Sequence, residues 1–244
     1  MKERILDLCD RTLKTWQVQC TPFLAPPDLA EATTYLSRLT DVQFLAWGGY
    51  AQAERQKLAI APVELELSPD CVPLAVLNIR GNFLFDPASH RDFLGAILGT
   101  GVERDQVGDV IVLGETGAQA IASPHIAEYL ELQLTQVRTV PVKTQIIPSA
   151  ELKVRPPQKK EIITTEASLR LDAVASAGFA MSRSKMVELI NNEELRVNWQ
   201  NVSSPSHQLR SGDLVTLRGK GRLEIGEISI TKKNRYRIQL WRTT

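Results

Sequence analysis

Basic and hydroxyl side chains gather where a helix is predicted to begin in the last third of the chain. Ser182 is a typical N-cap residue, and Arg183, Ser184 and Lys185 then fall in the first turn of a helix that runs to Ile190. Cations at this end oppose the helix dipole, which favours anions there. A phosphate group bound among the free N–H groups would explain the arrangement. Two ordinary surface cations that fall early in a helix are the simpler alternative.

More polar residues lie on both sides of this helix. A shorter helix is predicted before it, with Asp172 near its start and Gly178 as its C-cap, and we expect Asp172 to orient Arg170 or Arg183. After it come predicted antiparallel strands with alternating apolar residues. They carry the remaining candidate contacts and a turn: Arg196, Asn198, Gly212, Asp213, Arg218, Lys220 and Arg222.

The charge distribution agrees with a polyanionic partner. Residues 1–150 contain 12 Lys and Arg against 18 Asp and Glu, a net charge of −6, whereas residues 151–244 contain 17 against 10, a net charge of +7. A basic third behind an acidic body favours nucleic acid as the ligand, with a merely solvated charged surface as the alternative.

Signals for catalysis, metals and membranes are weak. Ser182-x-x-Lys185 matches the nucleophile motif of penicillin-binding enzymes, but its companion motifs are missing. The three cysteines and three histidines are scattered, so we expect no metal site and no cofactor. The charged N-terminus argues against a secretory signal, and no apolar run approaches the roughly 20 residues of a transmembrane helix. The sequence therefore predicts a non-catalytic protein in a cytosol-like compartment.

The elements that must position these residues form an α+β protein in several segments. Residues 1–60 are predicted to be helical and then mixed. The apolar face of a first helix is formed by Ile5, Leu6, Cys9, Leu13 and Trp16, and Asp28 caps a second helix that ends at Leu39. Residues 148–164 are rich in Pro and Lys and are predicted to be a linker. Residues 165–244 contain two short helices followed by strands.

Residues 61–147 show the element order β-α-β-β-α-β, which is typical of a ferredoxin-like domain. RNA-recognition domains share this order and stack bases on aromatic residues of their first and third strands. The corresponding stretches here, PLAVLNI and AQAIA, contain no aromatic residue. We therefore expect a scaffold or docking domain and no recognition by stacking.

The C-terminal segment resembles the S4 (S-four, alpha-L) RNA-binding motif over residues 165–223. The resemblance lies in the order of Arg170-Leu171-Asp172, Ser182-Arg183 before an apolar helix, Arg196-Val197-Asn198, and Gly212-Asp213 before a strand. Glu193-Glu194 and Trp199 stand where the family usually has glycine, so we expect the turn to be built differently there. The resemblance implies RNA contacts from Arg170, Ser182, Arg183, Ser184, Lys185, Arg196, Asn198, Arg218, Lys220 and Arg222, supported by Asp172, Gly178, Gly212 and Asp213.

Two earlier stretches extend the resemblance to the YlmH-type proteins, whose phototroph branch is described as the photosystem II S-four domain protein. They are YAQAERQKLAIAP (residues 50–62) and SHRDFLGAILGTGVERDQVGDVIV (residues 89–112). This resemblance implies a ribosome-associated, cytoplasmic protein, near thylakoids in a phototroph, that binds structured rRNA or tRNA on a ribosomal subunit, not DNA, in ribosome quality control. The alternative is a protein-interaction adaptor, or an assembly or repair factor for photosystem II, whose acidic first domains bind a protein partner and whose RNA binding is residual.

Overall fold

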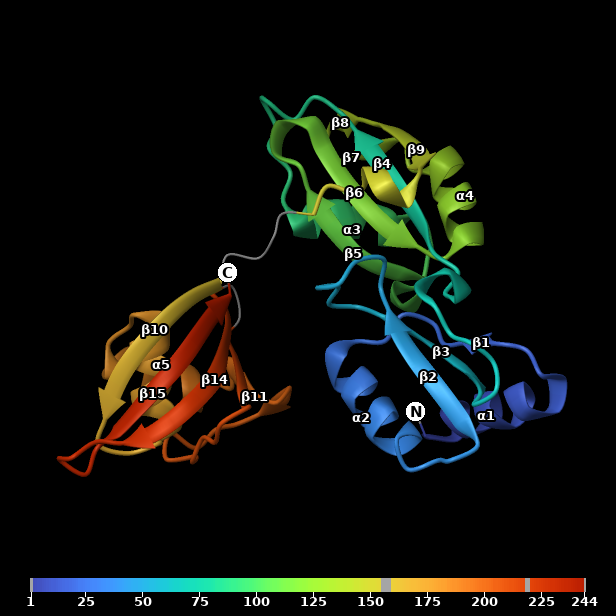
Figure 1. Cartoon of the computed structure of the whole chain (residues 1–244). Coiled ribbons are helices and arrows are strands. Elements are labelled where there is room, and N and C mark those ends of the chain that lie inside the picture. Colours follow the sequence, from blue (N-terminus) through green and yellow to red (C-terminus); the bar gives the residue numbers. More distant parts are fainter. Residues whose placement is uncertain (1, 155–158, 218–219, 244) are drawn as a thin grey trace. The chain divides into compact units, whose positions relative to one another are not determined.

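The computed structural model describes residues 2–154, 159–217 and 220–243, and the chain divides into two compact units, residues 1–155 and 156–244 (Figure 1). The first unit contains an N-terminal domain and a middle domain, each built around its own sheet. In the described part of the chain, no helix is both long and apolar enough to cross a membrane.

The N-terminal domain packs two helices against a three-stranded antiparallel sheet. Its elements are α1 (Lys2–Thr15), β1 (Gln19–Cys20), α2 (Pro26–Leu36), β2 (Val42–Trp47) and β3 (Lys57–Pro62), with the strand order β1-β3-β2. The central strand β3 is buried along its whole length. Its core joins residues of both helices to the sheet, including Ile5, Leu36, Leu58 and Ile60.

The two predicted helices of this domain are confirmed, but details of each prediction are wrong. Helix α1 buries Ile5, Cys9 and Thr12, whereas Leu6 and Leu13 are each 39 % and Trp16 is 58 % exposed. Thr12 takes the buried position because its hydroxyl donates a hydrogen bond to the carbonyl of Ile60, 3.2 Å away.

Helix α2 begins at Pro26 and ends at Leu36, not at Leu39, and Ala25 is its N-cap. Asp28 therefore lies inside the first turn and does not cap the helix. Proline at the first helical position has a backbone already set for helix and lacks the N–H that a cap would satisfy.

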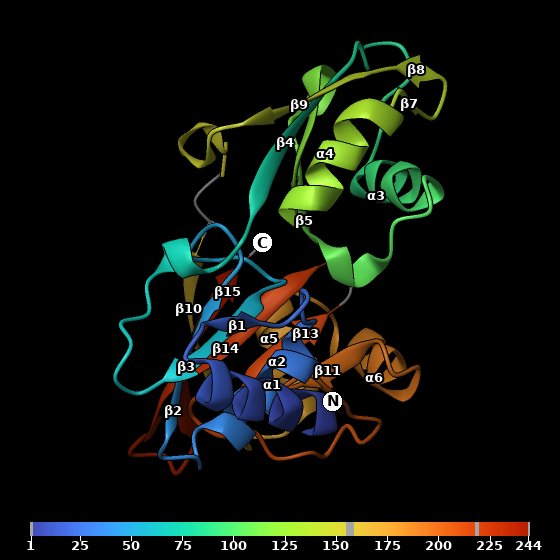
Figure 2. The same ribbon diagram turned by 90° about the vertical axis from the view of Figure 1, so that its right-hand side faces the viewer.

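The middle domain has the predicted ferredoxin-like fold. Its main elements are β4 (Ala75–Arg80), α3 (His90–Gly99), β5 (Val107–Val112), β6 (Gly117–Ala122), α4 (Pro124–Gln133) and β9 (Lys143–Ile147), and its minor strands are β7 (Gln136–Val137) and β8 (Val140–Pro141). The strand order β5-β6-β4-β9, antiparallel throughout, places β4 and β6 in the centre. Both helices lie on one face of the sheet (Figure 2). Side chains alternate along a strand, so Leu77 and Ile79 enter this core while Asn78 and Arg80 face the other side.

Polar contacts join the N-terminal and middle domains. The Asp109 carboxylate accepts hydrogen bonds from the Tyr50 hydroxyl at 2.7 Å and from the backbone N–H groups of Glu54 and Arg55 at 2.7 and 3.1 Å. The buried ammonium group of Lys57 donates to Ser123 at 2.9 Å. The spans 1–60 and 61–147 therefore belong to one compact unit.

The predicted linker, residues 148–164, contains ordered structure at both ends. A 3-10 turn covers Ser149–Glu151, and β10 (Lys159–Glu166) begins six residues before the predicted domain start at Thr165. Strand β10 pairs with the last strand of the chain along its whole length, which places it in the C-terminal unit. Residues 155–158, with Pro156 and Pro157, lie outside the described residues.

The C-terminal unit packs two short helices on a six-stranded sheet. The helices are α5 (Leu171–Phe179) and α6 (Arg183–Asn191). The strands after β10 are β11 (Leu195–Val197), β12 (Gln200–Asn201), β13 (Leu214–Leu217), β14 (Gly221–Ile230) and β15 (Tyr236–Thr243), in the sheet order β10-β15-β14-β13-β11-β12. Met186, Leu189 and Ile190 form the buried face of α6.

Gly178 supports this unit in another way than predicted. It lies inside α5, and the C-cap is Ala180, whose φ of 55° is left-handed. A Cβ atom on Gly178 would come 2.3 Å from a methyl carbon of Leu223 on β14. The residue must be glycine because helix and sheet approach each other closely here, so the prediction of a capping glycine is wrong.

Candidate nucleic-acid interface

A buried carboxylate between two guanidinium groups organises the start of both helices. Asp172, in the first turn of α5, is 3 % exposed. Arg170 donates from Nε to Oδ1 at 3.0 Å and from Nη2 to Oδ2 at 3.2 Å. Arg183, the first residue of α6, donates to Oδ2 from Nε at 3.1 Å and lies 3.0 Å from it through Nη2. Asp172 therefore fixes both arginines, where the sequence predicted one or the other.

The electrostatics of this cluster follow from its geometry. Burial alone would raise the pKa of Asp172, but the hydrogen bonds and charges of Arg170 and Arg183 outweigh burial, and the pKa lies below its ordinary value. The hydrogen bond to Asp172 raises the pKa of Arg170. The cluster thus holds one negative and two positive charges, and both guanidinium groups remain partly exposed.

The start of α6 has the predicted cap. The Ser182 hydroxyl accepts a hydrogen bond from the backbone N–H of Lys185 at 3.3 Å. Ser182, Arg183, Ser184 and Lys185 are all exposed. The ammonium group of Lys185 lies 2.9 Å from Glu188, one turn along the helix, in a solvated ion pair that can open at little cost.

A second group of predicted residues lies on the sheet. Arg196 on β11 pairs with Thr216 on β13, and Thr216 pairs with Arg222 on β14, so the three side chains form a row on one face. Arg196 donates to Asn201 at 3.1 Å. Arg222 lies over the ring of Trp199, 5.1 Å from its centre. Lys220 is exposed, and Arg218 lies outside the described residues.

The turn between β11 and β12 is held by Asp213. Its carboxylate accepts a hydrogen bond from the Asn198 side chain at 2.9 Å, and Asn198 in turn accepts one from the backbone of Leu214 at 3.0 Å. Gly212 precedes it with a φ of 88°. Asn198 is therefore engaged within the protein through both ends of its amide.

The expectation of a differently built turn at Glu193 and Trp199 is wrong. Trp199 has a φ of 67° and Glu193 a φ of 57°, both in the left-handed region that favours glycine. The backbone at these two positions thus keeps a conformation suited to glycine although the side chains are large.

Thr216 is a residue of this surface that the sequence analysis missed. The Oγ1 atom of Thr216 is buried without a hydrogen-bond partner among the described residues. Only strand register places Thr216 between two arginines, and no local sequence signal marks it.

Comparison with known proteins gives a family for every domain. Residues 2–65 match the family described as "YlmH, N-terminal", residues 72–151 match "Putative RNA-binding domain in YlmH", and residues 169–215 match "S4 domain". The description of the middle family differs from our expectation of a scaffold or docking domain there.

Known proteins share sequence or fold with this chain. "Ribosome-associated protein quality control protein P2" of Bacillus subtilis is 33 % identical over 227 residues, which cover 91 % of this chain and 86 % of that protein. "Small ribosomal subunit protein uS4" of Desulfotalea psychrophila is 38 % identical over 60 residues, 24 % of this chain and 29 % of that protein. The solved structure of "Cell division protein ylmH from Streptococcus pneumoniae" shares the fold with a TM-score of 0.53 at 17 % identity, over 62 % of this chain and 92 % of that one.

Proposed function

This chain belongs to the YlmH family, and on that premise we propose that it acts on the ribosome, where its S4 domain holds a folded rRNA or tRNA. The chain is an RNA-binding protein with an S4 domain and a second domain of an RNA-binding family. The ribosomal partner is supported by the name of the Bacillus relative, which describes that protein as ribosome-associated and part of protein quality control.

The arginine pair on Asp172 is the observation that carries the proposal. Each guanidinium group has five N–H donors, and each presents two nitrogens to Asp172. The remaining donors are left for phosphate oxygens. Because the carboxylate fixes both planar groups, less side-chain entropy is lost when RNA binds.

The other predicted contacts extend this surface. Ser182, Ser184 and Lys185 at the start of α6 would bind phosphate beside the arginine pair, and Arg196, Lys220 and Arg222 on the sheet would contact a further part of the backbone. Phosphate contacts carry little sequence information, so we propose recognition through the shape of a folded RNA. Asn198 would shape the turn more than contact RNA, because its amide is already engaged.

We assign this protein no catalytic role and a place in the cytoplasm with the ribosome. Among the described residues, no three His, Cys, Asp or Glu side chains form a group that could hold a metal ion. The relatives from Bacillus subtilis and Desulfotalea psychrophila carry ribosome-associated or ribosomal names, which favours this function over a photosystem adaptor that uses the acidic domains to bind a protein.

Crosslinking of the full-length protein to RNA in cells, followed by sequencing, tests this function. We expect crosslinks to concentrate in rRNA or tRNA and to map to the C-terminal unit of the protein. A crosslinked pool made up of messenger RNA, or recovery of protein partners without RNA, would contradict the proposal.

A further inference from the structure

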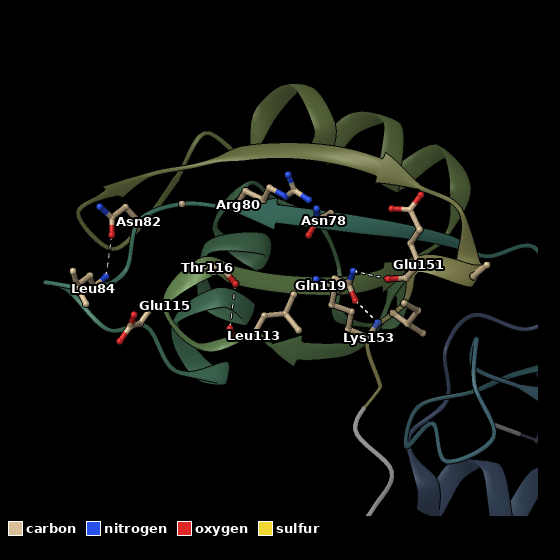
Figure 3. Close-up of a pocket in the computed structure, with 13 residues that line it drawn as sticks. Asn78, Arg80, Asn82, Leu84, Leu113, Glu115, Thr116, Gln119, Glu151 and Lys153 are labelled. Carbon is tan, nitrogen blue, oxygen red and sulfur yellow. Dashed lines mark hydrogen bonds between the residues drawn. The ribbon is translucent and has the colours of Figure 1, made fainter.

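A pocket of about 960 Å³ lies on the open face of the middle-domain sheet, opposite α3 and α4 (Figure 3). Its floor is formed by Asn78 on β4 and Gln119 on β6, which are direct partners in the two central strands. RNA-recognition domains with this fold bind RNA over the same two strands. The volume is in the range of sites for small organic ligands.

Asn78 is a buried amide whose side chain no described residue satisfies. It is 8 % exposed, it lines the pocket, and it takes part in no side-chain hydrogen bond within the described part of the chain. A primary amide offers two N–H donors and a carbonyl acceptor. The fully buried side-chain atoms without a partner among the described residues belong to Arg55, Thr216 and Arg242, so the amide of Asn78 is open to the pocket. A ligand with complementary donors and acceptors can replace the water that this amide would otherwise bind.

Gln119 is held rigidly beside it. Its Nε2 donates to the carbonyl of Glu151 at 3.0 Å, and its Oε1 accepts from the backbone N–H of Lys153 at 2.6 Å. The segment that follows β9 therefore borders the pocket and is fixed to its floor, as the dashed lines in Figure 3 show. The wall is thus formed before any ligand binds, which lowers the entropic cost of binding.

The remaining lining combines a free cation with apolar groups. Arg80, two residues after Asn78 on β4, is exposed and forms no ion pair within the described residues. Lys153 also lines the pocket, and Glu115 and Glu151 balance the two positive charges. Leu84 is 51 % exposed at the pocket, and the next residue, Phe85, is 90 % exposed. This neutral, amide-rich lining suits the edge of a base better than a cluster of phosphates.

We propose that this pocket binds one unpaired nucleotide of an RNA strand, with Asn78 hydrogen-bonding the base edge and Arg80 binding its phosphate. This inference rests on the proposed RNA-binding function and adds a second site to it. The absence of aromatic residues from the central strands removes stacking on the sheet but not readout by amides, which pair well with base edges. The base itself would lie against the apolar rim at Leu84.

A peptide is a poorer occupant than a nucleotide. Peptides that extend a sheet bind at an edge strand with free backbone groups. The pocket lies over β4 and β6, and each of these strands is already paired on both sides. Its backbone groups are therefore used within the sheet, and the side-chain amide of Asn78 is the group left to recognise a ligand.

Fluorescence anisotropy with the full-length protein and two RNA probes tests the proposal. One probe is a mixed-sequence single strand of about ten nucleotides, and the other is a closed RNA hairpin, for which we expect binding through the S4 domain. Asn78→Leu removes the amide, and Gln145→Leu on β9 is its control, because Gln145 pairs with Asn78 and does not line the pocket. Arg80→Gln removes the cation, and Arg91→Gln on α3, behind the sheet, is its control.

We expect Asn78→Leu and Arg80→Gln each to weaken single-strand binding by about fivefold to twentyfold, the value of one hydrogen bond to a buried or charged group. Hairpin binding and both controls should change less than about twofold. Arg80→Gln keeps the test valid if Asn78→Leu fails to fold, since Arg80 is exposed.

Two results would overturn the inference. One is unchanged single-strand binding by Arg80→Gln and by a folded Asn78→Leu protein; the other is an equal loss of single-strand binding in the control variants Gln145→Leu and Arg91→Gln. If the hairpin bound normally in these experiments, the proposed function would stand without the second site. If the wild-type protein failed to bind the hairpin, the proposed function itself would fail.

Discussion

The C-terminal unit and the middle domain present different chemistry on the surfaces that we assign to RNA. On the C-terminal unit, two guanidinium groups share the buried Asp172 carboxylate beside further exposed cations at the start of α6. On the middle domain, the buried polar group is the neutral amide of Asn78, and the two cations that line its pocket are balanced by two carboxylates.

The difference separates two parts of recognition that often occur on one surface. Phosphate contacts supply affinity and fix orientation, whereas hydrogen bonds to base edges supply sequence information. The fixed arginines of the C-terminal unit are suited to the first task and the amide of the middle domain to the second. A chain built in this way can bind the backbone of a folded RNA with one unit and recognise an unpaired base with the other.

Salt dependence should give the largest contrast between the two surfaces. With about four to six phosphate contacts, hairpin binding by the C-terminal unit should follow a slope of roughly −3 to −5 in log affinity against log salt, a hundredfold to thousandfold loss between 50 and 200 mM. Single-strand binding at the pocket involves Arg80 and Lys153, so its slope should be about −1. Equal slopes for the two probes would contradict our assignment of many phosphate contacts to the C-terminal unit and few to the pocket.

The next contrast lies between two pairs of cations on the C-terminal unit. Arg183→Ala with Lys185→Ala should cost roughly 2–4 kcal/mol of hairpin affinity, about 1–2 kcal/mol for each charge-assisted contact. Lys232→Ala with Lys233→Ala removes the same charge from an exposed turn between β14 and β15 and should cost clearly less. Titration of both double variants against the hairpin measures this, and equal losses would mean a diffuse electrostatic surface without a defined site.

The sequence alone predicts no change in stability for the first of these variants, because cations at a helix N-terminus oppose the dipole. The structure changes that expectation. Arg183 donates to the buried Asp172, so its removal leaves Arg170 as the only partner of that carboxylate among the described residues. We now expect a loss of about 1 kcal/mol in the free energy of unfolding, which a urea titration of the variant would detect.

Most of the fold could be predicted from sequence because its signals are local. The alternation of apolar residues, the Ser182 cap and the order of strands and helices in the middle domain need only neighbouring residues to be recognised. The roles of Thr12 and Gly178 could not be predicted in this way. Each depends on contact with a residue far along the chain, Ile60 for Thr12 and Leu223 for Gly178.

The same division holds for the two surfaces. The cations of the C-terminal unit were predictable because charge is visible in sequence and their order follows a known motif. Asn78 was not, since one asparagine in an apolar strand has no distinguishing pattern. Its significance comes from burial, from its register with Gln119 and from the missing hydrogen-bond partner, all of which require the three-dimensional structure.

Removing the partners of Asp172 should separate stability from binding. The double variant Arg170→Ala, Arg183→Ala leaves the buried Asp172 carboxylate unpaired. The free energy of unfolding of the C-terminal unit should fall by about 2–3 kcal/mol. This is less than for a fully buried ion pair, because both guanidinium groups are partly solvated in the wild-type protein. Adding Asp172→Ala removes the unpaired charge and should recover most of that stability without restoring hairpin binding. Urea titrations and anisotropy on the same proteins test this. Recovery of binding in the triple variant would show that the arginines do not contact RNA.

The smallest expected effect is the acid sensitivity that Asp172 gives to the C-terminal unit. Because the pKa of Asp172 is lower in the folded protein than its ordinary value of 3.8, the unfolded chain takes up the proton first as the pH falls. The stabilisation is therefore complete above roughly pH 5 and is lost as the pH falls through the folded pKa. Urea midpoints of the wild-type protein should fall more steeply below roughly pH 5 than those of the triple variant, which lacks Asp172. Asn78 is neutral at every pH in this range, so Asn78→Leu should leave the pH profile unchanged. Parallel profiles for the wild-type protein and the triple variant would mean that solvent already satisfies Asp172, and that the arginines are less firmly fixed than their hydrogen bonds indicate.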